Sequence, residues 1–107
     1  MGQLGRNKTM RVTILTLARN DLRDIRKHLS DYGSIPPKRF RASFEEFCIQ
    51  VADMPYMFGV YENKPKYRRA VIIYGYLVFY QVDEKMNTVK VFRVLHGKRN
   101  VEPLLDR

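Results

Sequence analysis

The sequence predicts an α+β domain in the order β-α-α-β-β-β, with an antiparallel meander sheet and a helical hairpin packed on one of its faces. The first observation is a dense run of β-branched and aromatic residues at positions 67–73, 76–82 and 88–96. The second is a pair of segments, 18–32 and 37–53, in which apolar residues recur every three or four positions. Strands and helices are therefore segregated along most of the chain, as in α+β domains.

Residues 1–9 are polar, contain glycine and show no periodicity, so we expect a disordered extension before a single domain at residues 10–107. Met10 is a candidate initiator in place of Met1. Residues 11–16 alternate and are rich in β-branched side chains, which predicts the first strand. We expect this strand at the sheet edge or beside the last strand, because its apolar side chains have no other core to join.

The first helix is expected after Thr16, a candidate N-cap, and Gly33 is expected to end it with a left-handed cap. Its charged residues, Asp21 among them, are placed on the solvent face. The apolar residues of its other face are Leu22, Ile25, Leu29 and Tyr32.

Pro36 and Pro37 begin the second helix, and Pro55 ends it. Because the link between the helices is short, they are expected to form an antiparallel hairpin whose apolar stripes cover one sheet face. The stripe of the second helix consists of Phe40, Phe44, Phe47, Cys48 and Val51.

Turn-forming residues separate the three C-terminal strands, at Gly75 and at residues 83–87. Links this short require antiparallel pairing, since a parallel return needs about a dozen residues or more. Apolar residues lie on both sides of the last strand, which predicts that both sheet faces are at least partly covered. Strict alternation assigns Val89, Val91 and Leu95 to one side and Phe92 and Val94 to the other.

Charge is the most unusual property of the composition. Twenty Lys and Arg residues stand against 11 Asp and Glu residues, which gives a formal net charge of +9. Such a surface suits an anionic partner, either a nucleic acid, an acidic polypeptide or a membrane surface, although a generally soluble basic surface is the alternative. No segment approaches the ~18 apolar residues of a membrane span, so we expect a cytoplasmic protein with no membrane partner.

One cysteine and two histidines exclude an intramolecular disulfide and a zinc site, and no cofactor is expected.

An ordered set of motifs runs along nearly the whole chain, from Met10 to Leu105. The motifs are Ala-x-x-Asp-Leu-x-x-Ile at 18–25, Met-Pro with a later glycine at 54–59, Tyr-Arg-Arg at 67–69, Gly-Tyr-Leu-Val-Phe-Tyr at 75–80 and Arg-Val-Leu-His-Gly-Lys-Arg-Asn at 93–100. Together they resemble the RelE/ParE superfamily of bacterial toxins. The resemblance implies a growth inhibitor of a type II toxin–antitoxin system, whose cognate antitoxin folds an acidic segment over the toxin.

The superfamily contains two activities. RelE-like members are ribosome-dependent mRNA endonucleases, whereas ParE-like members poison DNA gyrase by binding. In this sequence the RelE-type arginine falls on Leu77, the RelE-type tyrosine falls near Leu105, and the His-Tyr pair of another nuclease branch is His96-Gly97. These departures favour the ParE-like branch. The basic residues Lys64, Lys66 and Arg99 nevertheless keep the nuclease interpretation open. A non-toxic RNA-binding module is a further alternative.

If the protein is a nuclease, the resemblance suggests catalytic roles for basic residues near the RNA phosphate. These candidates are Lys66, Arg69, His96 and Arg99. Histidine is the residue type suited to proton transfer near neutral pH, but the missing partners favour the alternative that His96 ends a strand and hydrogen-bonds the backbone.

For target binding, we favour basic residues at strand ends beside loops. They are Arg68, Arg69, Lys98 and Arg99. Arg93, within an apolar strand, is as well explained by a structural ion pair as by target contact. Leu104 and Leu105 are expected to fold back against the sheet.

Overall fold

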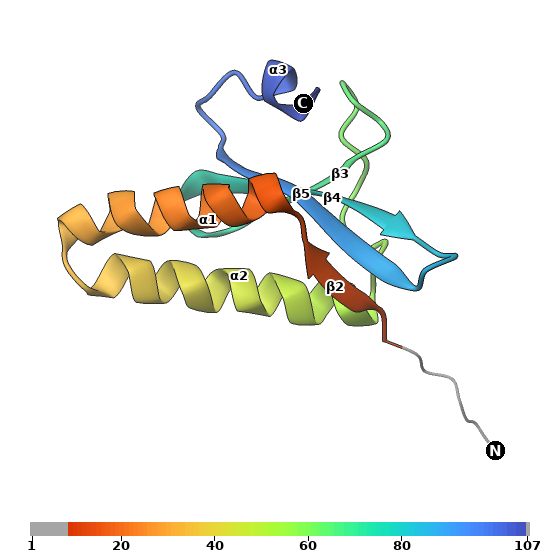
Figure 1. Cartoon of the computed structure of the whole chain (residues 1–107), viewed down its shortest axis with the longest axis horizontal. Coiled ribbons are helices and arrows are strands. Elements are labelled where there is room, and N and C mark those ends of the chain that lie inside the picture. Colours follow the sequence, from red (N-terminus) through yellow and green to blue (C-terminus); the bar gives the residue numbers. More distant parts are fainter. Residues whose placement is uncertain (1–8, 107) are drawn as a thin grey trace.

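The computed structural model describes residues 9–106, and it confirms the predicted α+β fold (Figure 1). Residues 1–8, most of the expected N-terminal extension, lie outside the described residues. In chain order the elements are β2 (Arg11–Ile14), α1 (Thr16–Leu29), the 3₁₀ turn η1 (Ser30–Tyr32), α2 (Ile35–Asp53), β3 (Arg68–Val71), the 3₁₀ turn η2 (Ile73–Gly75), β4 (Tyr76–Asp83), β5 (Thr88–His96) and the one-turn helix α3 (Glu102–Leu105).

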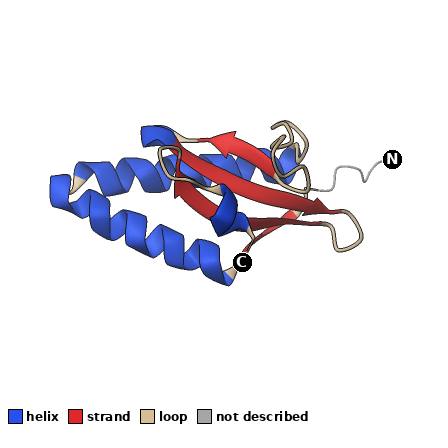
Figure 2. Cartoon of the chain, turned by 90° about the horizontal axis from the view of Figure 1, so that it is seen from above, coloured by secondary structure: helices blue, strands red, loops and turns tan. Residues whose placement is uncertain are grey.

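The four strands form one sheet, which is seen from above in Figure 2. Their order in the sheet is β2-β5-β4-β3. β3, β4 and β5 make the predicted antiparallel meander. β2 lies both at the edge and beside the last strand, and it pairs with β5 in parallel. Parallel pairing is available to β2 because the helical hairpin and two further strands separate it from β5 in the sequence.

The helical hairpin packs on one face of the sheet and buries the main core there. Phe47 of α2, for example, makes an edge-to-face contact with Tyr80 of β4, with ring centroids 5.5 Å apart. Three residues of the predicted stripes differ from expectation: Leu22 and Cys48 are only half-buried, and Tyr32 is 70% exposed. Tyr32 is exposed because α1 ends at Leu29 and the chain has entered η1.

Two helix starts also differ from the prediction. Thr16 is the first residue of α1 and not its cap, since Leu15 holds the cap position without a side-chain hydrogen bond. α2 begins at Ile35, so that Pro36 and Pro37 lie in its first turn, where the missing amide donors cost nothing. Within residues 9–106, no helix is long and apolar enough to cross a membrane.

A second apolar cluster, here called the tail cluster, lies on the opposite face of the sheet. Its buried residues are Tyr67, Phe79, Leu95, Val101 and Leu105, and its half-buried residues are Tyr61, Leu77, Phe92 and Leu104. The prediction that the C-terminal leucines fold back is therefore confirmed. The segment also forms an element of its own, α3, which was not expected.

A β-bulge in β5 decides which residues face which cluster. Phe79 pairs with Arg93 but Tyr80 pairs with Val91, so Phe92 is an extra residue in β5. The bulge reverses the alternation beyond this point. Val94 accordingly joins the main core and Leu95 joins the tail cluster, so the assignment expected from strict alternation is wrong for these two residues.

Candidate functional site

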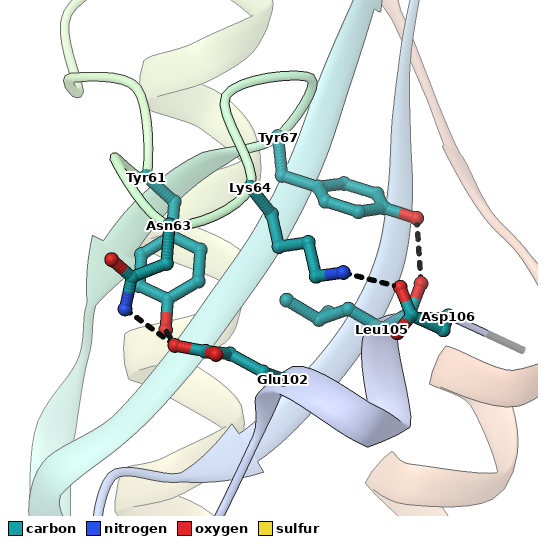
Figure 3. A network of polar contacts seen from close by, with 7 residues as sticks. All are labelled: Tyr61, Asn63, Lys64, Tyr67, Glu102, Leu105 and Asp106. Atoms are coloured by element: carbon teal, nitrogen blue, oxygen red, sulfur yellow. Dashed lines mark hydrogen bonds and ion pairs between the residues drawn. The ribbon is translucent and has the colours of Figure 1, made fainter.

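Polar contacts hold α3 against the loop that precedes β3 (Figure 3). The Glu102 carboxylate accepts hydrogen bonds from the Tyr61 hydroxyl, at 3.2 Å, and from the Asn63 side-chain amide. Lys64 Nζ lies 2.6 Å from Asp106 Oδ1, and this hydrogen bond raises the pKa of Lys64. Lys64, a basic residue that kept the nuclease interpretation open, is thus engaged within the protein.

Buried hydrogen bonds to the backbone of α3 complete this attachment. The Tyr67 hydroxyl donates to the Leu105 carbonyl at 3.0 Å, and Arg93 Nη1 donates to the Leu104 carbonyl at 2.9 Å. Residues from the loop, from β5 and from the chain end therefore meet on one sheet face. The tail cluster, with the basic residues around it, is the candidate site that the resemblance points to.

Arg68 and Arg69, predicted together as target contacts, point to opposite faces of the sheet. Arg69 pairs with Phe79 on the tail-cluster face, is exposed, and places its guanidinium 5.5 Å from the centre of the Tyr61 ring. Arg68 points to the helix face, where its Nη1 donates to the Phe58 carbonyl at 2.7 Å. Arg68 therefore holds the loop after α2, while Arg69 is available for a partner.

Lys66 and Arg69 are both exposed near the tail cluster, and the Lys66 ammonium lies 5.2 Å from the centre of the Tyr67 ring. Lys98 and Arg99 are exposed in the turn after β5. Arg69 pairs with Phe79 of β4, whereas Tyr76 of β4 pairs with His96 at the end of β5. Phe79 and Tyr76 are three residues apart in β4, which corresponds to about 10 Å along the strand. The predicted basic residues therefore come from two places on the sheet, the start of β3 and the turn after β5.

His96 belongs to the helix face and not to the tail-cluster face. It pairs with Tyr76, a main-core residue, and the two rings meet edge to face at 5.0 Å. Its Nδ1 accepts a hydrogen bond of 3.1 Å from the Lys98 backbone amide. The four nuclease candidates are thus not brought together, because His96 lies on the face opposite Arg69.

Sequence reasoning missed one buried polar cluster. Arg93 Nε and Nη2 donate to the two carboxylate oxygens of Asp21 at 2.7 and 2.8 Å, and this contact raises the pKa of Arg93. Asp21 Oδ2 also accepts from the Val94 backbone amide at 2.9 Å. The placement of Asp21 on the solvent face was therefore wrong, whereas the structural ion pair considered for Arg93 is confirmed.

The positions of the RelE-type arginine and tyrosine hold leucines, and both leucines have apolar surroundings in the structure. Leu77 packs against the tail cluster, and Leu105 is one of its buried members, with 3% of its surface exposed. Neither position offers a polar group to a substrate. Within residues 9–106, no three His, Cys, Asp or Glu side chains are grouped to hold a metal ion.

Solved structures with this fold include proteins of toxin–antitoxin systems. The RelBE2 complex of Mycobacterium tuberculosis gives a TM-score of 0.61 at 23% identity, covering 82% of this chain and 98% of that one. The RelBE complex of Escherichia coli gives 0.62 at 17% identity, covering 84% and 99%. The ParDE system of Pseudomonas aeruginosa gives 0.64 at 16% identity, covering 82% and 96%. These likenesses show the shared fold.

Comparison with curated proteins found none that matches this sequence. Comparison with protein families did find a match, to the family described as the ParE toxin of the type II toxin–antitoxin system parDE, over residues 12–101. This range includes the helical hairpin and the whole sheet apart from the first residue of β2. The chain therefore belongs to the ParE toxin family of type II toxin–antitoxin systems.

Proposed function

We propose that this toxin inhibits growth by binding DNA gyrase and that it does not itself cleave RNA. The observation that carries the proposal is the tail cluster, which places Leu77 and Leu105 where a RelE-type site would use arginine and tyrosine. Because these two positions carry no polar group, the site is better suited to binding a protein target than to cleaving RNA. The family match to ParE toxins supports the same choice.

RNA cleavage would require a group that activates the ribose 2′-hydroxyl and a group that protonates the leaving oxygen. Near the tail cluster, Lys66 and Arg69 carry positive charge that can stabilise a phosphate. His96, the candidate of a suitable residue type, lies on the other face and uses its Nδ1 for a backbone contact. This distribution favours binding over chemistry.

We also propose a cognate antitoxin as partner, with both proteins acting in the cytoplasm. The structurally similar proteins named above belong to toxin–antitoxin systems, and two of them were solved as complexes. The net charge of +9 favours an antitoxin whose toxin-binding segment is acidic. Such a segment would cover the basic residues beside the tail cluster.

Induced expression of the toxin without an antitoxin tests the target. We expect filamentous cells with trapped gyrase–DNA complexes and with protein synthesis initially intact. His96→Ala should cost no more than an ordinary contact, on the order of 1 kcal/mol, because binding to gyrase requires no proton transfer. His28→Ala serves as the matched control, since His28 is the other histidine of the chain.

The opposite result is equally clear. Immediate translation arrest, with new mRNA 5′ ends inside codons at the ribosomal A site, would show a RelE-like endonuclease. In that case His96→Ala should lose about 10²–10⁴ in rate if His96 is the general acid or base. Expression with no effect on growth would instead favour the RNA-binding module.

A further inference from the structure

A pocket of about 370 Å³ lies where the closed end of the helical hairpin meets the end of β5. It is separate from the tail cluster, since it opens on the helix side of the sheet, where Tyr76 and His96 point. Both histidines of the chain and three of its tyrosines line it. The lining residues are His28, Leu29, Tyr32, Pro36, Tyr74, Tyr76 and His96.

Four of the five rings that line this pocket form two edge-to-face pairs, and two of the five, Tyr32 and Tyr74, are well exposed. His28 and Tyr32 meet edge to face with centroids 5.7 Å apart, and Tyr76 and His96 do so at 5.0 Å. Tyr32 is 70% exposed and Tyr74 is 40% exposed. Aromatic surface is thus held open to solvent beside an apolar floor of Leu29 and Pro36, ready to pack against a flat ring.

The backbone holds Tyr74 in a conformation that tyrosine rarely adopts. Its φ is +64°, and the next residue, Gly75, has a φ of +78°. The Gly75 carbonyl accepts a hydrogen bond of 2.9 Å from the Gly97 amide, which ties this turn to the end of β5. Backbone strain of this kind is concentrated at ligand-binding sites, where it pre-organises side chains.

Two cations follow directly after His96. Lys98 and Arg99 are exposed, and no ion pair between side chains of residues 9–106 includes either of them. The Lys98 amide is hydrogen-bonded to His96 Nδ1, so Lys98 starts at the pocket rim. Because Nδ1 is engaged in that bond, Nε2 is the ring nitrogen of His96 that remains for a ligand.

We propose that this pocket binds an unpaired nucleobase of a single-stranded nucleic acid, with Lys98 and Arg99 on the adjacent phosphates. Stacking on aromatic rings beside cations that follow the backbone is how proteins bind single strands without sequence preference. The net charge of +9 favours the same class of ligand. An aromatic side chain of a protein partner would fill the pocket but would leave the two cations without phosphates.

The two histidines make the proposal directly testable by NMR of the full chain. The ring C–H signals of His28 and His96 report on this pocket alone, because the chain has no other histidine. The probes are a short oligothymidylate, the corresponding oligouridylate, and an abasic strand of equal length. We expect both histidine signals to shift with a base-carrying strand and to shift much less with the abasic one. The DNA and RNA arms identify which strand is preferred.

Variants separate the base contact from the phosphate contact. Tyr32→Leu should weaken oligonucleotide binding about tenfold, because a stacking platform is removed. Lys98→Ala and Arg99→Ala should each lower the slope of log K against log salt by about 0.7. Matched controls are Tyr56→Leu, which removes a tyrosine that does not line the pocket, and Lys85→Ala, in the turn at the other end of β5.

Three outcomes would overturn the proposal. They are unmoved histidine signals, equal shifts with the abasic strand, and shifts that appear only with a peptide from the antitoxin. None of these measurements depends on gyrase or on toxicity, so failure here is distinguishable from failure of the proposed function.

Discussion

The Asp21 carboxylate, which contacts Arg93, also takes the place of a neighbouring strand as hydrogen-bond acceptor at the edge of β5. β2 ends at Ile14, and the Leu15 amide makes the next bond, to the Val91 carbonyl. Beyond this point the edge of β5 has no strand beside it. The Asp21 carboxylate accepts a hydrogen bond from the Val94 amide there instead. A buried amide without an acceptor would be costly, so this carboxylate serves both the backbone and the guanidinium.

Asp21→Ala is expected to destabilise the fold by about 3–5 kcal/mol, because it leaves the buried Arg93 guanidinium without its carboxylate and the Val94 amide without an acceptor. Urea denaturation measures this change in the free energy of unfolding. Asp24→Ala is the control, since Asp24 is exposed on the same helix, and its effect should stay within about 0.5 kcal/mol. Equal effects of the two substitutions would show that the pair contributes little.

The Cys48 thiol is expected to react slowly with alkylating reagents. Burial, with a smaller contribution from the charge of Glu45, raises its pKa from 9.0 to about 11. A higher pKa leaves less of the reactive thiolate at pH 8, about a hundredfold less than at an ordinary thiol. Iodoacetamide labelling followed by mass spectrometry measures the rate, which should still be rising above pH 10.

Glu45→Gln gives the matched test of this cause. Because burial is the larger contribution, the substitution should accelerate labelling only modestly. A rate at pH 8 equal to that of an unstructured cysteine peptide would contradict the assignment.

At the scale of elements, α3 is important because it covers apolar surface that the sheet leaves open. Val101 and Leu105 are both buried against Phe79 and Leu95. The polar contacts of Glu102 and the backbone contact at Leu105 hold the short helix in register. A helix of one turn is not stable by itself, so these tertiary contacts are what maintain it.

Leu105→Ala is expected to cost about 2–5 kcal/mol, since it leaves a cavity in the tail cluster. Thermal or urea unfolding measures the loss. Ile49→Ala is the matched aliphatic control, because Ile49 is 68% exposed on α2. Its effect should be close to zero.

Deletion of residues 101–107 removes the whole cover and should lower stability or toxicity more than Leu105→Ala does. An unchanged melting curve together with full toxicity would show that the tail is dispensable.

At the scale of the whole molecule, the charge of +9 is spread over separate surfaces. Lys66 and Arg69 lie near the tail cluster, whereas Lys98 and Arg99 follow the end of β5. A partner that masks one group need not mask the other. This arrangement would allow an antitoxin and a further ligand to bind different parts of the toxin.

Co-expression with the neighbouring gene product should yield a complex that survives purification at moderate salt. Screening weakens contacts between exposed charges, with a Debye length of about 10 Å at 0.1 M salt, but it leaves an apolar interface intact. Size-exclusion chromatography at increasing salt measures this. Loss of the complex at moderate salt would contradict the expected antitoxin, while Lys66→Ala and Arg69→Ala should mainly slow association.

The sequence by itself determined the four strands, the two long helices and their order, but not α3. Hydrophobic period and turn residues act between near neighbours, so the hairpin of α1 and α2, the meander and the last strand at residues 88–96 were predictable. The ordered motifs also indicated the RelE/ParE superfamily, which the family match confirms. The return of Leu105 to the sheet also followed, because an apolar chain end has little else to cover.

Only the tertiary structure decided which side chains meet. Asp21 and Arg93 are 72 residues apart, and a charge on a helix looks solvent-facing until the unpaired edge of β5 is placed beside it. The bulge at Phe92 reverses the alternation of β5, which no local pattern signals. The sheet faces on which the Arg69 and His96 side chains lie likewise depend on the register of the strands. Register is fixed by contacts between distant strands, and for that reason the grouping of the site residues could not be read from the sequence.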